Sequence, residues 1–196
     1  MTINTEDMLN SILASVSRIK RINPEDIPNI DLYMDQVTTF MDAQLASSKR
    51  NPDDKILTKT MINNYAKNHL LPSPNKKKYS KEHQLMLIFI YYFKNILSIT
   101  DIQALLNPIS EKYFQKKDGL NVESLYREVF SLEDEQIEYM KNDLVEKYKI
   151  SQSTFTEAPE EDQEFLHLFS FLCLLSFDVY VKKQLIEKLI DSLPSD

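Results

Sequence analysis

Glycine and cysteine are nearly absent from this chain. Its 196 residues include one glycine, Gly119, and one cysteine, Cys173. Glycine-rich phosphate loops are therefore nearly excluded, and tight β-hairpin turns are disfavoured. A lone cysteine excludes an internal disulfide and suits a reducing cytosol, and we expect Cys173 to be a small core residue. The fold class that remains is all-α.

Signals for secretion and membrane insertion are also lacking. The N-terminus has no basic stretch followed by an apolar one. The longest apolar run, residues 165–181, contains His167 and Asp178 and falls short of the roughly 20 apolar residues of a membrane span. We expect Asp178 to face outward or to pair with Lys182 one helical turn further on. These features predict a cytoplasmic protein with no membrane contact.

Motifs for catalysis and metal binding are missing as well. The three histidines, His69, His83 and His167, do not pair with another histidine or with the cysteine at metal-ligand spacing. The sequence contains no nucleophile elbow, P-loop or dinucleotide fingerprint. Its carboxylates fall on predicted polar faces or at helix starts. We therefore expect no enzyme activity, no metal and no cofactor.

Helical periodicity dominates the pattern of apolar residues that is present. The spacing predicts helices over 5–22, 31–48 and 58–70. Residues 85–93 are consecutive apolar positions, and a helix that is apolar all round must be buried all round, so this segment is predicted to form the centre of the core. Ser98, followed by Asp101, has the spacing of a capping box and opens a short helix that should end before Pro108.

The second half of the chain is predicted to be helical too. A Ser/Thr-rich linker at 151–158 precedes a final long helix that runs from Pro159 to about residue 193. This helix carries more apolar surface than one flank of a small bundle needs, which predicts a homodimer through the C-terminal helices. The alternative is that the same residues fill the core of the monomer. The residues concerned are Phe165, Leu168, Phe169, Leu172, Leu175 and Phe177.

Charge is distributed unevenly along the chain. The net charge is −7, yet residues 55–106 carry eight lysines against Glu82 and Asp101. This split indicates a basic contact surface on an acidic helical body. For the run Lys76–Lys78 an ordinary solvated surface is an equally good interpretation.

The predicted helix 58–70 has one polar stripe opposite its apolar face. Thr60, Asn63, Asn64 and Lys67 follow one another at helical spacing. Asparagine can bond adenine through two hydrogen bonds, and threonine and lysine can contact bases or phosphates, so the stripe suits a DNA groove. A plain solvent-facing stripe is the alternative. The candidate DNA-binding residues are Lys59, Thr60, Asn63, Asn64, Lys67, Lys76, Lys77 and Lys78.

The end of this helix resembles the recognition helix of MerR-type winged helix-turn-helix regulators. These regulators carry a phrase close to T-I-R-Y-Y-E-x-x-G-L-L-P. Leu70-Leu71-Pro72 matches its end, and Tyr65 and Ile62 take the places of the second Tyr and the Ile. Asn63, Ala66 and His69 hold the family's Arg, Glu and Gly places.

A second match to MerR-type regulators lies downstream. Tyr79-Ser80, the apolar run 85–93 and the segment 98–102 resemble a Tyr followed by a capped apolar helix and then S-L-x-E-I. The resemblance covers about 50 residues. It implies that the helix 58–70 reads DNA and that 72–79 forms a short wing.

The chain also resembles an uncharacterised family of bacterial proteins. The blocks that carry this resemblance are residues 32–37, 58–65 and 76–79. We therefore predict an N-terminal helix at 1–23 that packs on the body, a MerR-like domain at 24–106 and a helical domain at 107–196. The expected function is transcription regulation through double-stranded DNA. The alternative is a protein-interaction module on a winged-helix scaffold that no longer binds DNA.

Overall fold

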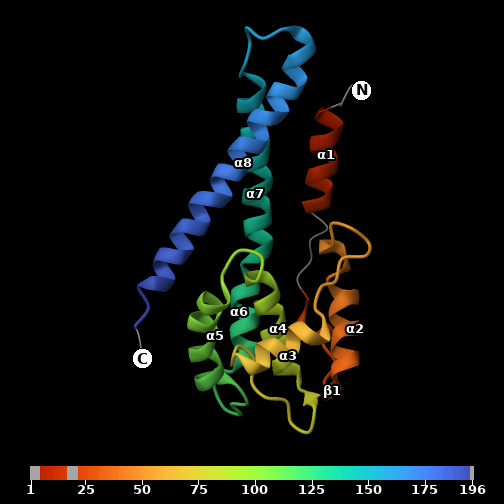
Figure 1. The fold of residues 1–196 in the computed structure, drawn as a ribbon, viewed down its shortest axis with the longest axis vertical. Helices are drawn as coiled ribbons and strands as arrows, with labels where there is room; N and C mark the ends of the chain where they lie inside the picture. Colours follow the sequence, from red (N-terminus) through yellow and green to blue (C-terminus); the bar gives the residue numbers. More distant parts are fainter. Residues whose placement is uncertain (1–4, 17–21, 195–196) are drawn as a thin grey trace. The chain divides into compact units, whose positions relative to one another are not determined.

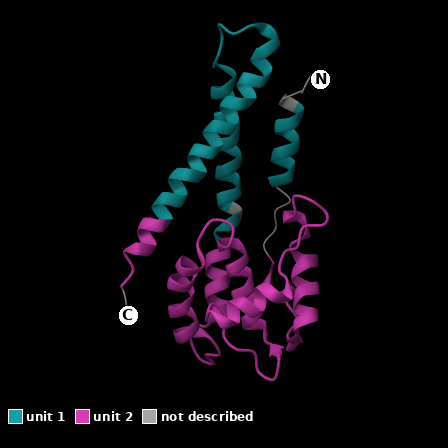
Figure 2. Ribbon diagram, viewed as in Figure 1, with its two compact units in different colours: residues 1–20, 132–186 teal, residues 21–131, 187–196 magenta. Residues whose placement is uncertain are grey.

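The computed structural model describes residues 5–16 and 22–194 (Figure 1). Helix accounts for 69% of the structure and strand for 3%, so the predicted all-α class is confirmed. The chain divides into two compact units (Figure 2). Unit 1 comprises residues 1–20 and 132–186, and unit 2 comprises residues 21–131 and 187–196.

Unit 2 contains most of the short elements. Its two strands pair antiparallel, with Leu32 opposite Tyr79 and Tyr33 opposite Lys78. Residues 98–131 lie in the same unit, so this unit extends past residue 106 to residue 131. In chain order its elements are η1 (Pro24–Asp26), β1 (Leu32–Tyr33), α2 (Met34–Gln44), η2 (Ala46–Ser48), α3 (Lys59–Lys67), β2 (Lys78–Tyr79), α4 (Lys81–Phe93), α5 (Ile99–Tyr113) and α6 (Val122–Ser131).

Helix α4 is the centre of unit 2. Every residue from His83 to Tyr91 is buried, which confirms the prediction from the consecutive apolar residues. Ser80 begins the helix with a capping box, in which its main-chain N–H donates to His83 Nδ1 at 3.0 Å. Aromatic rings join α4 to α6, and Phe89 meets Tyr126 edge to face at 5.6 Å between ring centroids.

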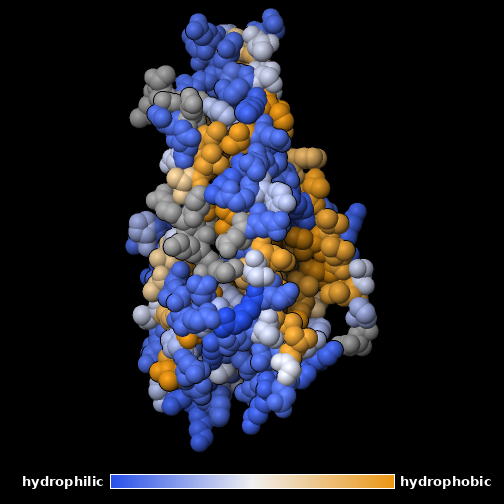
Figure 3. All heavy atoms as spheres, turned by 180° about the vertical axis from the view of Figure 1, so that it is seen from behind, coloured by the Kyte–Doolittle hydropathy of each residue, from blue (hydrophilic) through white to orange (hydrophobic). Residues whose placement is uncertain are grey.

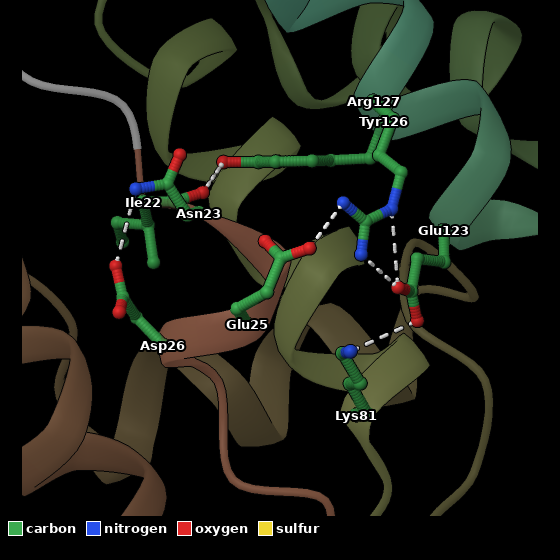
Figure 4. Close-up of polar contacts among 8 residues, drawn as sticks. All are labelled: Ile22, Asn23, Glu25, Asp26, Lys81, Glu123, Tyr126 and Arg127. Carbon is green, nitrogen blue, oxygen red and sulfur yellow. Dashed lines mark hydrogen bonds and ion pairs between the residues drawn. The ribbon is translucent and has the colours of Figure 1, made fainter.

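A polar network fixes the first residues of unit 2 (Figure 4). The buried hydroxyl of Tyr126 donates to the carbonyl of Ile22 at 2.7 Å. Arg127 bonds Glu25 and Glu123, both at 2.6 Å, and Glu123 also pairs with Lys81 at 2.9 Å. The hydrogen bond from Arg127 lowers the pKa of Glu25. These contacts attach the chain before η1 to α6, and α6 to the first turn of α4.

The prediction that the helix opened by Ser98 ends before Pro108 is wrong. The capping box of Ser98 and Asp101 is present, but α5 continues through Pro108 to Tyr113. A proline inside a helix leaves the carbonyl four residues earlier without its donor. Pro108 and Ala104 are both exposed, so water can satisfy that carbonyl.

Unit 1 is built from α1 (Thr5–Val16), α7 (Glu133–Gln152) and the greater part of α8 (Glu160–Asp191). Its core is formed by Leu9, Leu144 and Phe171, which come from the three different helices. The first helix therefore packs against helices of the second half. Residues 17–21 of the predicted N-terminal helix lie outside the described residues. Partly buried residues complete this core: Leu13, Val16, Tyr148 and Leu175.

The turn between α7 and α8 is held by α8 itself. His167 Nε2 lies 2.9 Å from the carbonyl of Thr154, and the Thr154 and Ser170 hydroxyls lie 2.9 Å apart. Further along α8, Asp178 pairs with Lys182 at 2.9 Å, as predicted. The same carboxylate lies 3.6 Å from Lys147 of α7. Polar contacts therefore join α7 and α8 both at the turn and further along the pair.

One expectation for α8 is wrong. Cys173 is exposed, because the core of unit 1 takes the side of the helix that carries Phe171. Within the described residues, α8 is the one helix long and apolar enough to cross a membrane, and only 6% of its most apolar window is buried. Length and composition alone are weak evidence for a membrane span, since core helices of soluble proteins share them.

Candidate nucleic-acid interface

Helix α3 begins at a side-chain cap. The hydroxyl of Thr58 accepts a hydrogen bond from the main-chain N–H of Met61 at 3.2 Å, which satisfies one donor of the first turn. The helix spans residues 59–67, within the predicted range of 58–70. Its inner face buries Ile62 and Tyr65, and burial raises the pKa of the Tyr65 hydroxyl.

The opposite face of α3 carries the candidate DNA-binding side chains. Lys59, Thr60, Asn63, Asn64 and Lys67 are all exposed. Because the buried face packs inside unit 2, the orientation of this polar stripe is set by the core. The structure therefore gathers five of the eight candidate residues on one exposed helix face.

A left-handed residue ends α3. His69 has a φ of 58°, and its N–H donates to the carbonyl of Ala66 at 3.3 Å. The N–H of Leu70 donates to the carbonyl of Tyr65 at 2.9 Å. These two bonds form a Schellman motif, in which glycine is the usual left-handed residue. The side chain of Gln103 donates to the carbonyl of Asn68, so α5 also holds this end of α3.

A tight turn presents two further candidate residues (Figure 1). Lys76 and Lys77 have φ values of 49° and 64°, and the N–H of Lys78 donates to the carbonyl of Asn75 at 2.9 Å. Two consecutive left-handed residues define a turn of the hairpin type. The expectation that tight turns are disfavoured without glycine is therefore wrong here. Both lysines are exposed at the tip of the segment 72–79.

Lys78 is held in place by its strand partner. It lies in β2 opposite Tyr33 of β1, and its ammonium group lies 5.2 Å from the centroid of the Tyr33 ring. A cation over an aromatic face is attracted by the electron density of the ring. Periodicity does not reveal Tyr33, because its contact with Lys78 joins residues 45 positions apart.

The basic segment 55–106 offers less free charge than its lysine count suggests. Lys94 donates to the carbonyl of Ile56 at 2.7 Å, and burial lowers its pKa. Lys81 pairs with Glu123. Lys59, at the start of the stripe, pairs with Asp35 of α2. In contrast, Lys67, Lys76 and Lys77 form no ion pair with any residue that the structure describes.

An open cleft of about 490 Å³ lies beside the start of α3. Its lining comes from α2 and from the chain that leads into α3. Among residues 5–16 and 22–194, no group of three or more His, Cys, Asp or Glu side chains is placed to hold a metal ion. The cleft residues are Thr38, Thr39, Asp42, Ala43, Lys55, Leu57, Thr58 and Lys59.

A domain family matches the part of the chain that carries these features. It is described as Domain of unknown function (DUF1836), and it matches residues 22–129. The chain belongs to this family. The DUF1836 domain nearly coincides with the continuous part of unit 2, residues 21–131. No curated protein and no solved structure matches the chain.

The DUF1836 domain thus contains α3, both strands and the turn between Asn75 and Lys78, together with the α4 core. The predicted membership of an uncharacterised family is confirmed. The tertiary structure adds three residues to the candidate surface that periodicity does not reveal. They are Tyr33, Asp35 and Gln103, and each contacts a candidate residue or the end of α3 from a distant part of the sequence.

Proposed function

We propose that the DUF1836 domain of this chain binds double-stranded DNA and regulates transcription. In this proposal α3 enters a groove and the segment 72–79 acts as a wing. The observation that carries it is the exposed polar stripe on α3, followed by the turn that exposes Lys76 and Lys77. The succession of α3, the segment 72–79, α4 and α5 resembles that of MerR-type winged helix-turn-helix domains.

Different residues have different roles in the proposed complex. Asn63 and Asn64 stand at the middle of the exposed stripe and are suited to base edges in the major groove. Lys67, Lys76 and Lys77 are exposed and are not neutralised by any acidic side chain that the structure describes, so they are suited to phosphates. The left-handed backbone at Lys76 and Lys77 also supports the proposal, because strained conformations concentrate at functional sites.

A titration of labelled duplex at low salt tests the proposal. Asn63→Ala should cost about 1–3 kcal/mol on one preferred sequence and little on mixed sequence. Replacing Lys76, Lys77 and Lys78 by alanine should weaken all sequences alike. It should also lower the salt dependence by about one unit of log–log slope for each phosphate that is no longer neutralised. If no duplex is bound at about 50 mM salt, DNA is not the ligand.

A matched control distinguishes binding by the lysines of the turn from attraction by any exposed positive charge. Lys112, near the end of α5, and Lys116 and Lys117, which follow that helix, are also exposed lysines of unit 2. Replacing these three by alanine removes the same charge, but should leave binding largely unchanged. Equal weakening by the two triple variants would mean that attraction is not specific to the turn.

One observation favours the second candidate, a protein-interaction module. Ile30 and Tyr33 are exposed by 67% and 54%, close in sequence to Asp35, which neutralises Lys59. Exposed apolar side chains beside a neutralised charge suit a protein partner better than a phosphate backbone. In that case Tyr33→Ala would abolish partner capture, and neither the Asn63 nor the lysine variants would matter.

A further inference from the structure

Helix α8 is apolar on two opposite sides. Its inner side carries Phe171, which is buried in the core of unit 1, and Leu175, which packs against that core. Its outer side carries five large side chains that are exposed by 50–67%. At 3.6 residues per turn these five fall within about 140° of one another. We call them the α8 apolar face: Phe165, Phe169, Leu172, Phe177 and Tyr180.

Two rings of the α8 apolar face lie against each other. The rings of Phe165 and Phe169 stack on each other with centroids 6.5 Å apart. Apolar surface runs along the side of the molecule where α8 lies (Figure 3). A helix that is apolar all round is normally covered all round, so this exposed side indicates a missing partner.

We propose that the partner is a second copy of this chain, whose α8 packs antiparallel on the first. An aromatic side chain has roughly 150–250 Å² of surface in total. The four aromatic side chains of the face are each exposed by 50–67%, so together they offer about 500 Å² per copy for burial. With Leu172 added, two copies approach the roughly 1,200 Å² at which specific interfaces begin. The proposed dimer does not depend on DNA binding.

Charge decides the direction of the two helices. The first residues of α8 include Glu160, Glu161, Asp162 and Glu164, with no basic residue among them. The far end, still within unit 1, carries Lys183 and Lys182, of which Lys182 also pairs with Asp178. Parallel pairing would place the acidic ends together, whereas antiparallel pairing places each acidic end beside lysines.

The apolar face also sets the register. Its first and last residues are Phe165 and Tyr180, so the two-fold axis passes between Leu172 and Cys173. This register sets Phe165 opposite Tyr180 of the second copy, and Asp162 opposite Lys183. Cys173 is exposed, and in this arrangement it lies close to its own symmetry mate.

Sedimentation of the full chain at micromolar concentrations tests the dimer. The expected mass is twice the 23.0 kDa of one chain. Phe169→Lys places a charge within the face and should weaken association about tenfold or more. Ile150→Lys is the matched control, because Ile150 is an apolar residue of α7 with 55% exposure that lies outside the face. Circular dichroism would establish that both variants are folded.

Cross-linking with a short bismaleimide tests the direction. Cys173 is the only cysteine, so the wild-type product reports one position and should be a covalent dimer. In a Cys173→Ser background, Phe165→Cys should not cross-link to itself, because antiparallel copies hold the two thiols about 22 Å apart along the helix. A mixture of the Phe165→Cys and Tyr180→Cys chains, each in that background, should cross-link.

Several results would overturn the proposal. A chain that stays monomeric, or a dimer that tolerates Phe169→Lys, would show that the α8 apolar face does not pair with itself. Efficient self-linking of Phe165→Cys would show parallel helices. The chain could instead stay monomeric and co-sediment with vesicles of phosphatidylcholine and phosphatidylglycerol. If Phe169→Lys abolished that co-sedimentation, the α8 apolar face would be assigned to a lipid surface.

Discussion

The hydroxyl of Tyr126 donates a hydrogen bond of 2.7 Å to the main-chain carbonyl of Ile22, 104 residues earlier in the chain. Ile22 is the first residue of the DUF1836 match, and Tyr126 lies three residues before its end. The bond therefore ties the two ends of the domain together. Both residues are buried, so water cannot replace the donor if the hydroxyl is removed.

Tyr126→Phe should lower the free energy of unfolding by about 1–2 kcal/mol, because it leaves the buried carbonyl of Ile22 without this donor. Urea denaturation followed by circular dichroism measures the change. Tyr139→Phe is the control, since Tyr139 is 60% exposed and its hydroxyl bonds Glu135 at the surface. Equal effects of the two variants would contradict a special role for the Tyr126 bond.

His69→Gly should stabilise the protein by about 0.5–1 kcal/mol. His69 is left-handed at the end of α3, where a residue with a β-carbon is strained and glycine is not. The neighbouring Asn68→Gly should not stabilise, because Asn68 has a φ of −94° and its side chain bonds the carbonyl of Asn64. Thermal unfolding of both variants tests this difference. A decrease in the stability of His69→Gly would mean that the imidazole makes a contribution larger than the strain.

Gln84→Leu should raise the free energy of unfolding by about 1–2 kcal/mol. Gln84 is fully buried in α4, and neither atom of its amide has a hydrogen-bond partner among the described residues. Gln103→Leu serves as the comparison, because the Gln103 amide does donate to the carbonyl of Asn68. Destabilisation by Gln84→Leu, measured in urea, would show that the amide is satisfied in solution.

Stability should fall as the pH drops below about 6.5. Burial lowers the pKa of His83, against the opposing effect of the Ser73 and Pro72 main chain and of Asp31. The unfolded chain therefore binds this proton at a higher pH than the folded protein, and stability decreases between the two pKa values by at most about 1.4 kcal/mol per pH unit.

His83→Gln should flatten this part of the pH dependence. Glutamine can still accept the N–H of Ser80, as His83 Nδ1 does now, but it does not titrate. Urea unfolding at several pH values from about 7.5 down to about 5 would compare the two proteins. An identical pH dependence in wild type and variant would assign the effect to other groups.

Local patterns determined much of the fold. Nine consecutive apolar residues predicted that α4 is buried, and the structure buries it from His83 to Tyr91. The spacing of Ser98 and Asp101 predicted a helix start, and the pair forms a capping box. Helical periodicity also separated the inner face of α3 from the exposed stripe. These features depend on residues within one or two turns of each other, which is why the sequence alone is sufficient.

Contacts between distant segments were decided by the tertiary structure. The pairing of Tyr33 with Lys78 depends on two strands meeting, and no local pattern identifies strands of two residues. The left-handed lysines of the turn are held by that pairing, although the lack of glycine argued against such a turn. Cys173 is exposed rather than buried because α8 is apolar on opposite sides, and only the packing of Phe171 decides which side faces the core. Periodicity reports that a helix has an apolar face, whereas which face is covered depends on which surfaces the folded chain brings together.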